Sequence, residues 1–80
     1  MGRTIHSDDY RELLALIRET REAAGFTQAG LAAELGRPQS WVSKVEIGER
    51  RLDVAELRLL CNALGIDLVK VIREWEARLS

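Results

Sequence analysis

The short segment QSWVSK carries polar side chains that suit hydrogen bonding better than catalysis. They are Gln39, Ser40, Ser43 and Lys44. Val42 and Val45 lie three positions apart and are enough to tie one face of a short helix to a core, so the polar side chains point elsewhere. A Gln amide can pair with adenine through two hydrogen bonds, a Lys ammonium can donate to guanine, and a Ser hydroxyl can contact either kind of base. The residue types are therefore suited to reading base edges.

Positive charge is concentrated around this segment. The formal net charge of all 80 residues is −1, which by itself does not favour a nucleic-acid ligand. Residues 36–51 nevertheless hold four Lys or Arg against two Glu, and such a local patch can bind phosphate even when the whole molecule is acidic. Arg50 and Arg51 taken alone would be an ordinary solvated surface. Because they directly follow the polar segment, we expect them to contact a phosphate backbone.

The sequence offers little support for catalysis or metal binding. It contains no Ser, His and Asp arrangement near a credible pocket and no glycine-rich phosphate loop, so we expect neither an enzyme nor a cofactor. Cys61 is the single cysteine, which excludes an intramolecular disulfide and a cysteine metal cluster. We expect it to be a small buried residue, with a redox sensor as the alternative.

The composition also argues against a membrane or secreted protein. No apolar run approaches the roughly 20 residues of a membrane span. The N-terminal stretch MGRTIHSDDY lacks the apolar segment of a secretory signal. We therefore expect a cytoplasmic protein without a membrane partner, associated with the nucleoid if it binds DNA.

Apolar spacing and helix stop signals predict a single all-α domain over residues 1–80. The five expected helices run from about Asp8 to Ala24, Gln28 to Leu35, Pro38 to Ile47, Asp53 to Leu64 and Asp67 to Leu79. No segment alternates long enough to suggest a strand, and every connection is short, so the chain should form one compact unit. Residues 1–8 are expected to be a flexible N-terminal arm.

Local signals indicate several of the expected helix ends. Thr27 is placed to cap the second helix, and Asp53 with Glu56 three residues later forms an acidic capping box for the fourth. Gly25 stands where the first helix should end in a left-handed cap. The inner stripe of that first helix is expected to be Tyr10, Leu13, Leu14, Ile17 and Ala24.

The connection between the second and third expected helices is the most informative one. Gly36–Arg37 is too short for antiparallel packing, so the two helices must cross steeply. Ala32 provides a side chain small enough for their close approach. A shared core is available from Leu31, Leu35, Val42 and Val45. These are the features of a helix-turn-helix, whose second helix projects into the major groove of DNA.

The motifs across roughly residues 13–66 resemble those of the Cro/repressor-type (XRE) helix-turn-helix family. In order along the chain they are TQAGLA, LG, SWVSKVEIG and the closing ALG. The resemblance implies a compact five-helix, lambda-repressor-like domain that binds double-stranded DNA. Two positions depart from the family pattern, because Arg37 stands at a usually apolar position and Pro38 replaces a usual capping Ser or Thr.

The resemblance also implies roles for individual residues. The base-reading residues would be Gln39, Ser40, Ser43 and Lys44. The phosphate-contacting residues would be Thr27, Gln28, Arg37, Trp41, Arg50 and Arg51. Two alternatives stay open, because Ser43 could reach a phosphate and Trp41 could cover the core edge against the fourth helix. Arg21 and Glu46 would form an internal ion pair that ties the first helix to the third.

The last expected helix indicates self-association. Its apolar stripe consists of Leu68, Ile72, Trp75 and Leu79. One monomer is not expected to cover all of this apolar surface, so we predict a two-fold dimer contact through Val71, Trp75 and Leu79. Such a homodimer would place two recognition helices roughly 34 Å apart, which matches an inverted-repeat DNA site.

The sequence as a whole predicts a homodimeric, sequence-specific transcriptional regulator. The simplest mechanism for it is repression by blocking polymerase. A controller protein of a restriction-modification system is a subtype of this prediction. The alternative is an antitoxin-type module that binds a partner protein, with DNA binding secondary.

Overall fold

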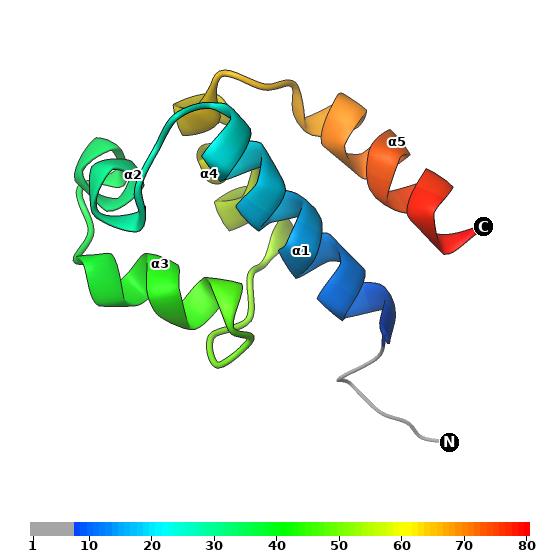
Figure 1. Ribbon diagram of the computed structural model, residues 1–80, viewed down its shortest axis with the longest axis horizontal. Coiled ribbons are helices and arrows are strands. Elements are labelled where there is room, and N and C mark those ends of the chain that lie inside the picture. The colour runs from blue at the N-terminus through cyan, green and yellow to red at the C-terminus, as the bar shows by residue number, and fades with distance from the viewer. Residues whose placement is uncertain (1–7) are drawn as a thin grey trace.

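The computed structural model describes residues 8–80, which form five helices joined by short connections (Figure 1). They are α1 (Asp8–Ala23), α2 (Gln28–Leu35), α3 (Gln39–Glu46), α4 (Val54–Leu64) and α5 (Leu68–Leu79). No strand occurs in this range, so the predicted all-α fold is confirmed. Of the predicted N-terminal arm, residues 1–7 lie outside the described residues, and Asp8 already belongs to α1.

The helices form two packed groups. α1 packs against α5 and α3, while α2 packs against α3 and α4. In Figure 1, α5 lies beside α1 and runs in the opposite direction, and α2 and α3 occupy the other end of the molecule. The α2–α3 pair and the C-terminal helix therefore lie toward opposite ends of a body 38 Å long.

Two apolar clusters hold these groups together. The larger cluster joins α1, α4 and α5 and contains Leu13, Leu14, Leu16, Ile17, Leu57, Cys61 and Val71. The smaller cluster joins α2, α3 and α4 and contains Leu31, Ala32, Val42 and Leu60. Because α4 contributes to both clusters, it fixes the α2–α3 pair relative to the α1–α5 pair.

The buried face of α1 differs from the prediction at two positions. Leu16 is buried although the predicted stripe did not contain it. Ala24 is exposed, so its assignment to the stripe is wrong. The reason is that α1 ends at Ala23 and the left-handed Gly25, with φ +83°, turns the chain away from the core. The cap predicted at Gly25 is confirmed.

The predicted N-terminal caps of α2 and α4 are present. Thr27 Oγ1 accepts a hydrogen bond from the Gly30 amide at 3.0 Å. Asp53 Oδ1 accepts from the Glu56 amide at 2.7 Å, and Glu56 Oε1 accepts from the Asp53 amide at 3.0 Å, which completes the capping box. α3 begins one residue later than predicted, because Pro38 is extended and provides no side-chain cap.

Membrane spans, metal sites and the single cysteine were considered above as possible functional features. Within residues 8–80, no helix has both the length and the apolar character needed to cross a bilayer. The same range contains no group of three or more His, Cys, Asp or Glu side chains that could hold a metal ion. Cys61 is a buried free thiol whose pKa is raised by desolvation, as expected for a packing residue.

Candidate nucleic-acid interface

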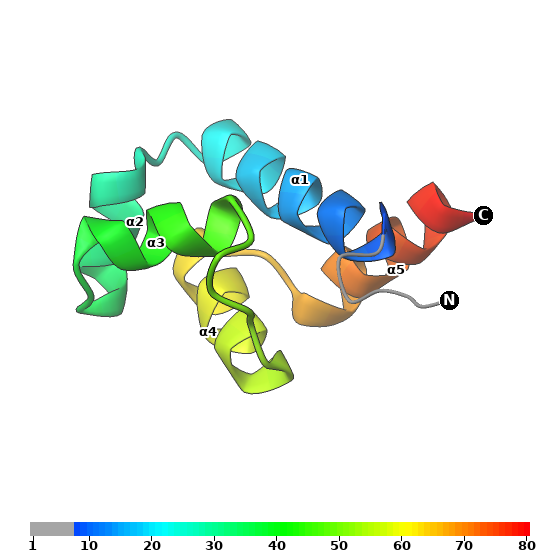
Figure 2. The ribbon, with the colours of Figure 1, turned by 90° about the horizontal axis from the view of Figure 1, so that it is seen from below.

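The connection between α2 and α3 turns the chain sharply at Gly36. This residue is left-handed, with φ +67°, a conformation that glycine adopts without a steric penalty. Its amide donates to the Ala33 carbonyl at 3.1 Å, and the Arg37 amide donates to the Ala32 carbonyl at 2.9 Å, so the end of α2 is closed. Figure 2 shows that α3 then lies steeply across α2, as the sequence predicted.

One side of α3 faces solvent at the front of the molecule in Figure 2. Val42 and Val45 are each 1% exposed and fix the opposite side of the helix to the core. Ser43 is half-buried. The exposed members of the predicted base-reading set are Gln39, Ser40 and Lys44. The helix therefore combines a rigidly held inner side with an open polar outer side.

The C-terminal end of α3 is held by the predicted ion pair between Arg21 and Glu46. Arg21 Nε donates to Glu46 Oε2 at 2.7 Å, and Arg21 Nη2 donates to Glu46 Oε1 at 3.2 Å. The two side chains are 9% and 4% exposed, so the pair is shielded from water. Its hydrogen bonds raise the pKa of Arg21. The pair joins α1 to α3, in agreement with the role that the resemblance implied.

The same network extends to the start of α2. Gln28 Nε2 donates to Glu46 Oε1 at 2.9 Å, and Arg21 Nη1 donates to the Phe26 carbonyl at 2.8 Å. Gln28, which was predicted to contact phosphate, is therefore half-buried and anchored. Its amide nitrogen carries a second hydrogen that can still be donated to a ligand. Apart from the motif positions of the two residues, no sequence pattern indicates this anchor.

Trp41 packs at the edge of the core. It lies against the smaller apolar cluster. Its indole Nε1 is buried and has no hydrogen-bond partner in the part of the chain that the structure describes. A buried Nε1 cannot donate a hydrogen bond to a phosphate. This position agrees with the alternative role at the core edge, where burial of a large indole is favourable.

Two arginines stack on the Trp41 ring at this edge of the core. The guanidinium carbon of Arg37 lies 4.4 Å from the ring centroid and that of Arg50 lies 5.2 Å from it, both within the range of a cation–π contact. The Arg51 guanidinium lies over the Tyr10 ring at 4.5 Å. Aromatic rings thus fix the positions of three cations beside α3.

Arg50 also forms an ion pair with Glu56 that the sequence reasoning missed. Arg50 Nη1 donates to Glu56 Oε1 at 3.1 Å, and Nη2 donates to Oε2 at 2.8 Å. These hydrogen bonds raise the pKa of Arg50 and lower the pKa of Glu56. The capping box was the available signal, because it fixes the Glu56 carboxylate beside the loop that carries Arg50. A phosphate at Arg50 therefore has an internal competitor.

α5 uses most of its apolar stripe inside the monomer. Val71 is 3% exposed and belongs to the larger core cluster, so its predicted place in a dimer contact is wrong. Trp75 is half-buried, and its Nε1 donates to the Asp9 carbonyl of α1 at 2.8 Å. Leu79 is also half-buried. Trp75 and Leu79 are therefore the two residues of the predicted contact that retain surface for a partner.

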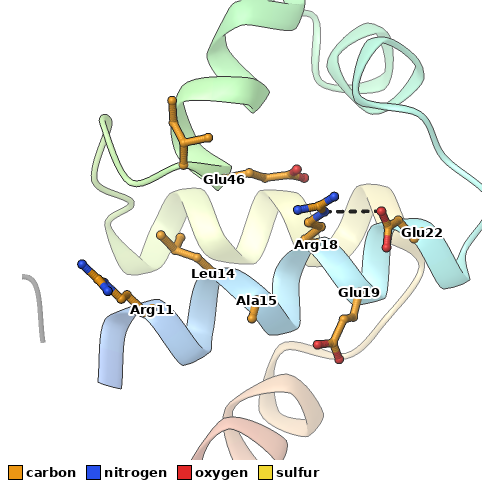
Figure 3. Close-up of a pocket in the computed structure, with 8 residues that line it drawn as sticks. Arg11, Leu14, Ala15, Arg18, Glu19, Glu22 and Glu46 are labelled. Atoms are coloured by element: carbon orange, nitrogen blue, oxygen red, sulfur yellow. Dashed lines mark hydrogen bonds and ion pairs between the residues drawn. The ribbon is translucent and has the colours of Figure 1, made fainter. Parts of the chain in front are cut away.

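A groove of about 580 Å³ lies between α1 and the C-terminal end of α3 (Figure 3). Its lining includes the apolar Leu14 and Ile47, of which Ile47 is 65% exposed. Its charged side chains include Arg18 and Glu22, which pair with each other at 3.4 Å. The groove thus combines aliphatic groups with charged side chains, several of which are paired within the protein.

Known proteins share both sequence and shape with this chain. Residues 12–73, from α1 into α5, match a family described as a helix-turn-helix domain. Among solved structures, the chain is similar to an XRE-family like protein from Pseudomonas syringae pv. tomato str. DC3000. The two are 50% identical with a TM-score of 0.87, over 95% of this chain and 93% of that chain. No curated protein gives a match.

Proposed function

The chain belongs to the XRE family of helix-turn-helix proteins, and on this premise we propose that it regulates transcription by reading double-stranded DNA with the outward face of α3. The proposal rests on one observation. Gln39, Ser40 and Lys44 are exposed on a helix whose other side is fixed by Val42 and Val45. A recognition helix needs this combination, because base contacts require open side chains on a rigid support.

Each polar side chain of α3 has a base edge that suits it. Gln39 is proposed to bind adenine N6 and N7, and Lys44 to donate to guanine O6 and N7. Ser40 can contact either kind of base. Ser43 is half-buried and has a shorter reach, so we place it at the rim of the contact, on a base or a phosphate.

The phosphate backbone is proposed to be held on both sides of α3. Thr27 and Gln28 stand at the start of α2, where backbone N–H groups and the helix dipole favour an anion. Arg37 precedes α3 and Arg51 follows it, so cations flank the recognition helix. Contacts of this kind position a protein on the duplex without reading its sequence.

We further propose that the protein acts as a homodimer through α5. Trp75 and Leu79 retain accessible apolar surface, and α5 lies at the opposite end of the molecule from α2 and α3 (Figure 1). A two-fold axis at this end leaves both recognition helices uncovered, as an inverted-repeat site requires. A dimer bound in this way would repress transcription by occluding polymerase.

The salt dependence of DNA affinity tests the phosphate contacts. The logarithm of the association constant should fall linearly with the logarithm of salt concentration, with a slope of about −0.9 per neutralised phosphate. Arg51→Ala is expected to flatten this slope by about 0.9 per protomer on any duplex, because one cation beside α3 is lost. Arg73→Ala is the matched control, since it removes an exposed cation from α5 and should leave the slope unchanged.

Two results would contradict the proposed function. The first is an absence of DNA binding, and the second is an affinity that does not depend on salt. Co-purification of a second protein together with either result would favour the antitoxin-type alternative.

A further inference from the structure

We propose that Glu56 sets the DNA affinity of this protein by competing with a DNA phosphate for Arg50. The inference rests on the proposed function, because Arg50 lies at the edge of the proposed DNA-binding face. It makes Glu56 a residue that determines affinity without touching DNA.

Arg50 is already bound in the way that a phosphate would bind it. Carboxylates and phosphates both accept two parallel hydrogen bonds from a guanidinium group. Glu56 occupies this position with nitrogen–oxygen distances of 3.1 and 2.8 Å, and Arg50 Nη1 also donates to the Arg51 carbonyl at 3.1 Å. The positive charge of Arg50 is therefore balanced within the protein.

Contacts at the start of α4 hold Glu56 in this position independently of Arg50. Its Oε1 also accepts the Asp53 amide of the capping box at 3.0 Å, and its side chain is only 17% exposed. It stands in the first turn of α4, where the helix dipole favours a negative charge. The hydrogen bonds from Arg50 lower the pKa of Glu56, so the carboxylate stays ionised at neutral pH. The competitor is thus a fixed anion.

Trp41 holds the Arg50 guanidinium through its ring. Arg37 stacks on the same ring, and its positive charge also acts on Glu56. Around the Trp41 indole the cluster therefore contains two cations, Arg37 and Arg50, and one anion, Glu56. Glu56 accepts from two of the guanidinium nitrogens and balances their charge, so a phosphate meets the full positive charge of Arg50 only when this carboxylate is absent. Loss of the carboxylate should therefore provide one further phosphate contact.

Glu56→Gln tests the competition with little change of shape. Gln keeps the side-chain acceptor of the capping box and removes the charge. We expect the salt slope to steepen by about 0.9 per protomer, and affinity at about 0.1 M salt to rise roughly five- to tenfold for each protomer. Glu49→Gln is the control, because it removes an exposed carboxylate from the same loop and leaves the Arg50–Glu56 pair in place.

Arg50→Ala supplies a second test when it is combined with Glu56→Gln. In the Glu56→Gln background it should abolish the gain in slope. Thermal unfolding followed by circular dichroism verifies that every variant is folded before its affinity is compared.

Different results would overturn the role of Glu56 and the proposed function itself. Equal salt slopes for Glu56→Gln and the parent would overturn the proposal. A lower affinity of Glu56→Gln would also overturn it, because Glu56 would then position Arg50 for a phosphate and not compete with one. A gain in slope that persists when Arg50→Ala is added to Glu56→Gln would have the same meaning. A parent protein without salt-dependent DNA binding would overturn the proposed function itself, whatever the Glu56 variant does.

Discussion

At the scale of single residues, Glu46 joins the elements that surround the proposed recognition helix. It is the last residue of α3, and it binds both Arg21 of α1 and Gln28 at the start of α2. A buried carboxylate with two partners gives α3 one orientation relative to its neighbours. Its removal would leave the buried Arg21 cation with only the Phe26 carbonyl and the more distant Glu22, which is costly.

Glu46→Ala should therefore lower the free energy of unfolding by about 3–5 kcal/mol, as measured by urea denaturation. Glu22→Ala is the matched control, because Glu22 lies 3.9 Å from Arg21 and is 54% exposed. An exposed pair of this kind should contribute about 1 kcal/mol or less. Equal losses in the two variants would show that the Arg21–Glu46 pair is not shielded in solution.

An ion pair could be predicted from the sequence only where both of its residues occupy motif positions. Arg21 and Glu46 both occupy motif positions, so their pairing followed from the resemblance. In the Arg50–Glu56 pair the capping box places Glu56, but the position of Arg50 depends on the path of residues 47–53, which no local pattern specifies. Trp41 illustrates the same limit. An indole on a short helix suits a core edge or a ligand surface equally well, and only the packing of α4 decides between them.

At the scale of elements, helix ends were more predictable than helix faces. The left-handed glycines and the capping residues act within a few positions of the sequence, so α2 has the predicted bounds and the ends of the other helices lie within one residue of theirs. The buried face of α1 depends on its neighbours. Leu16 is covered and Ala24 is not, because α4 and α5 pack on one side of the helix and the chain turns away after Ala23.

Acid should loosen the contact between α1 and α5. Arg78 donates two hydrogen bonds to Glu19, and these lower the pKa of Glu19. Because the folded state has the lower pKa, this stabilisation is fully present above the usual Glu value of about 4.5 and is lost as the pH falls through the folded value. Glu19→Gln should therefore lose less stability than the parent on acidification through this range.

The urea midpoint at neutral pH and at a pH below that range measures this difference. Glu34→Gln removes an exposed carboxylate of α2 and is the control, expected to follow the parent. If acidification lowers the urea midpoint of Glu19→Gln as much as that of the parent, the assigned role of the Glu19–Arg78 pair is contradicted.

At the scale of the whole molecule, the main question is how much of α5 one monomer covers. A chain of 80 residues has a small core, so apolar side chains that face this core are needed for the stability of the monomer. Val71 is used in this way, although the sequence pattern placed it in a dimer contact. Spacing on one helix shows which residues share a face but not which partner covers that face. Trp75 and Leu79 remain available at the outer edge of α5.

The proposed dimer predicts the behaviour of two variants in sedimentation equilibrium. Leu79→Glu should shift the protein toward the monomer, because it places a charge in the apolar contact. Ala77→Glu adds the same charge at an exposed position two residues away and should leave the parent's dimer intact. A parent protein that is monomeric at every concentration would refute the dimer.

The central claim is that the outward face of α3 reads bases. Selection from a pool of random duplexes, carried out in parallel with the parent and Lys44→Ala, tests it most directly. The parent should enrich an inverted repeat. Lys44→Ala should relax the preference at one base pair in each half-site, at a cost of about 1–3 kcal/mol, and keep the other positions. Enrichment of the same motif by both proteins with equal discrimination at every position, or no enrichment by the parent, would contradict the account.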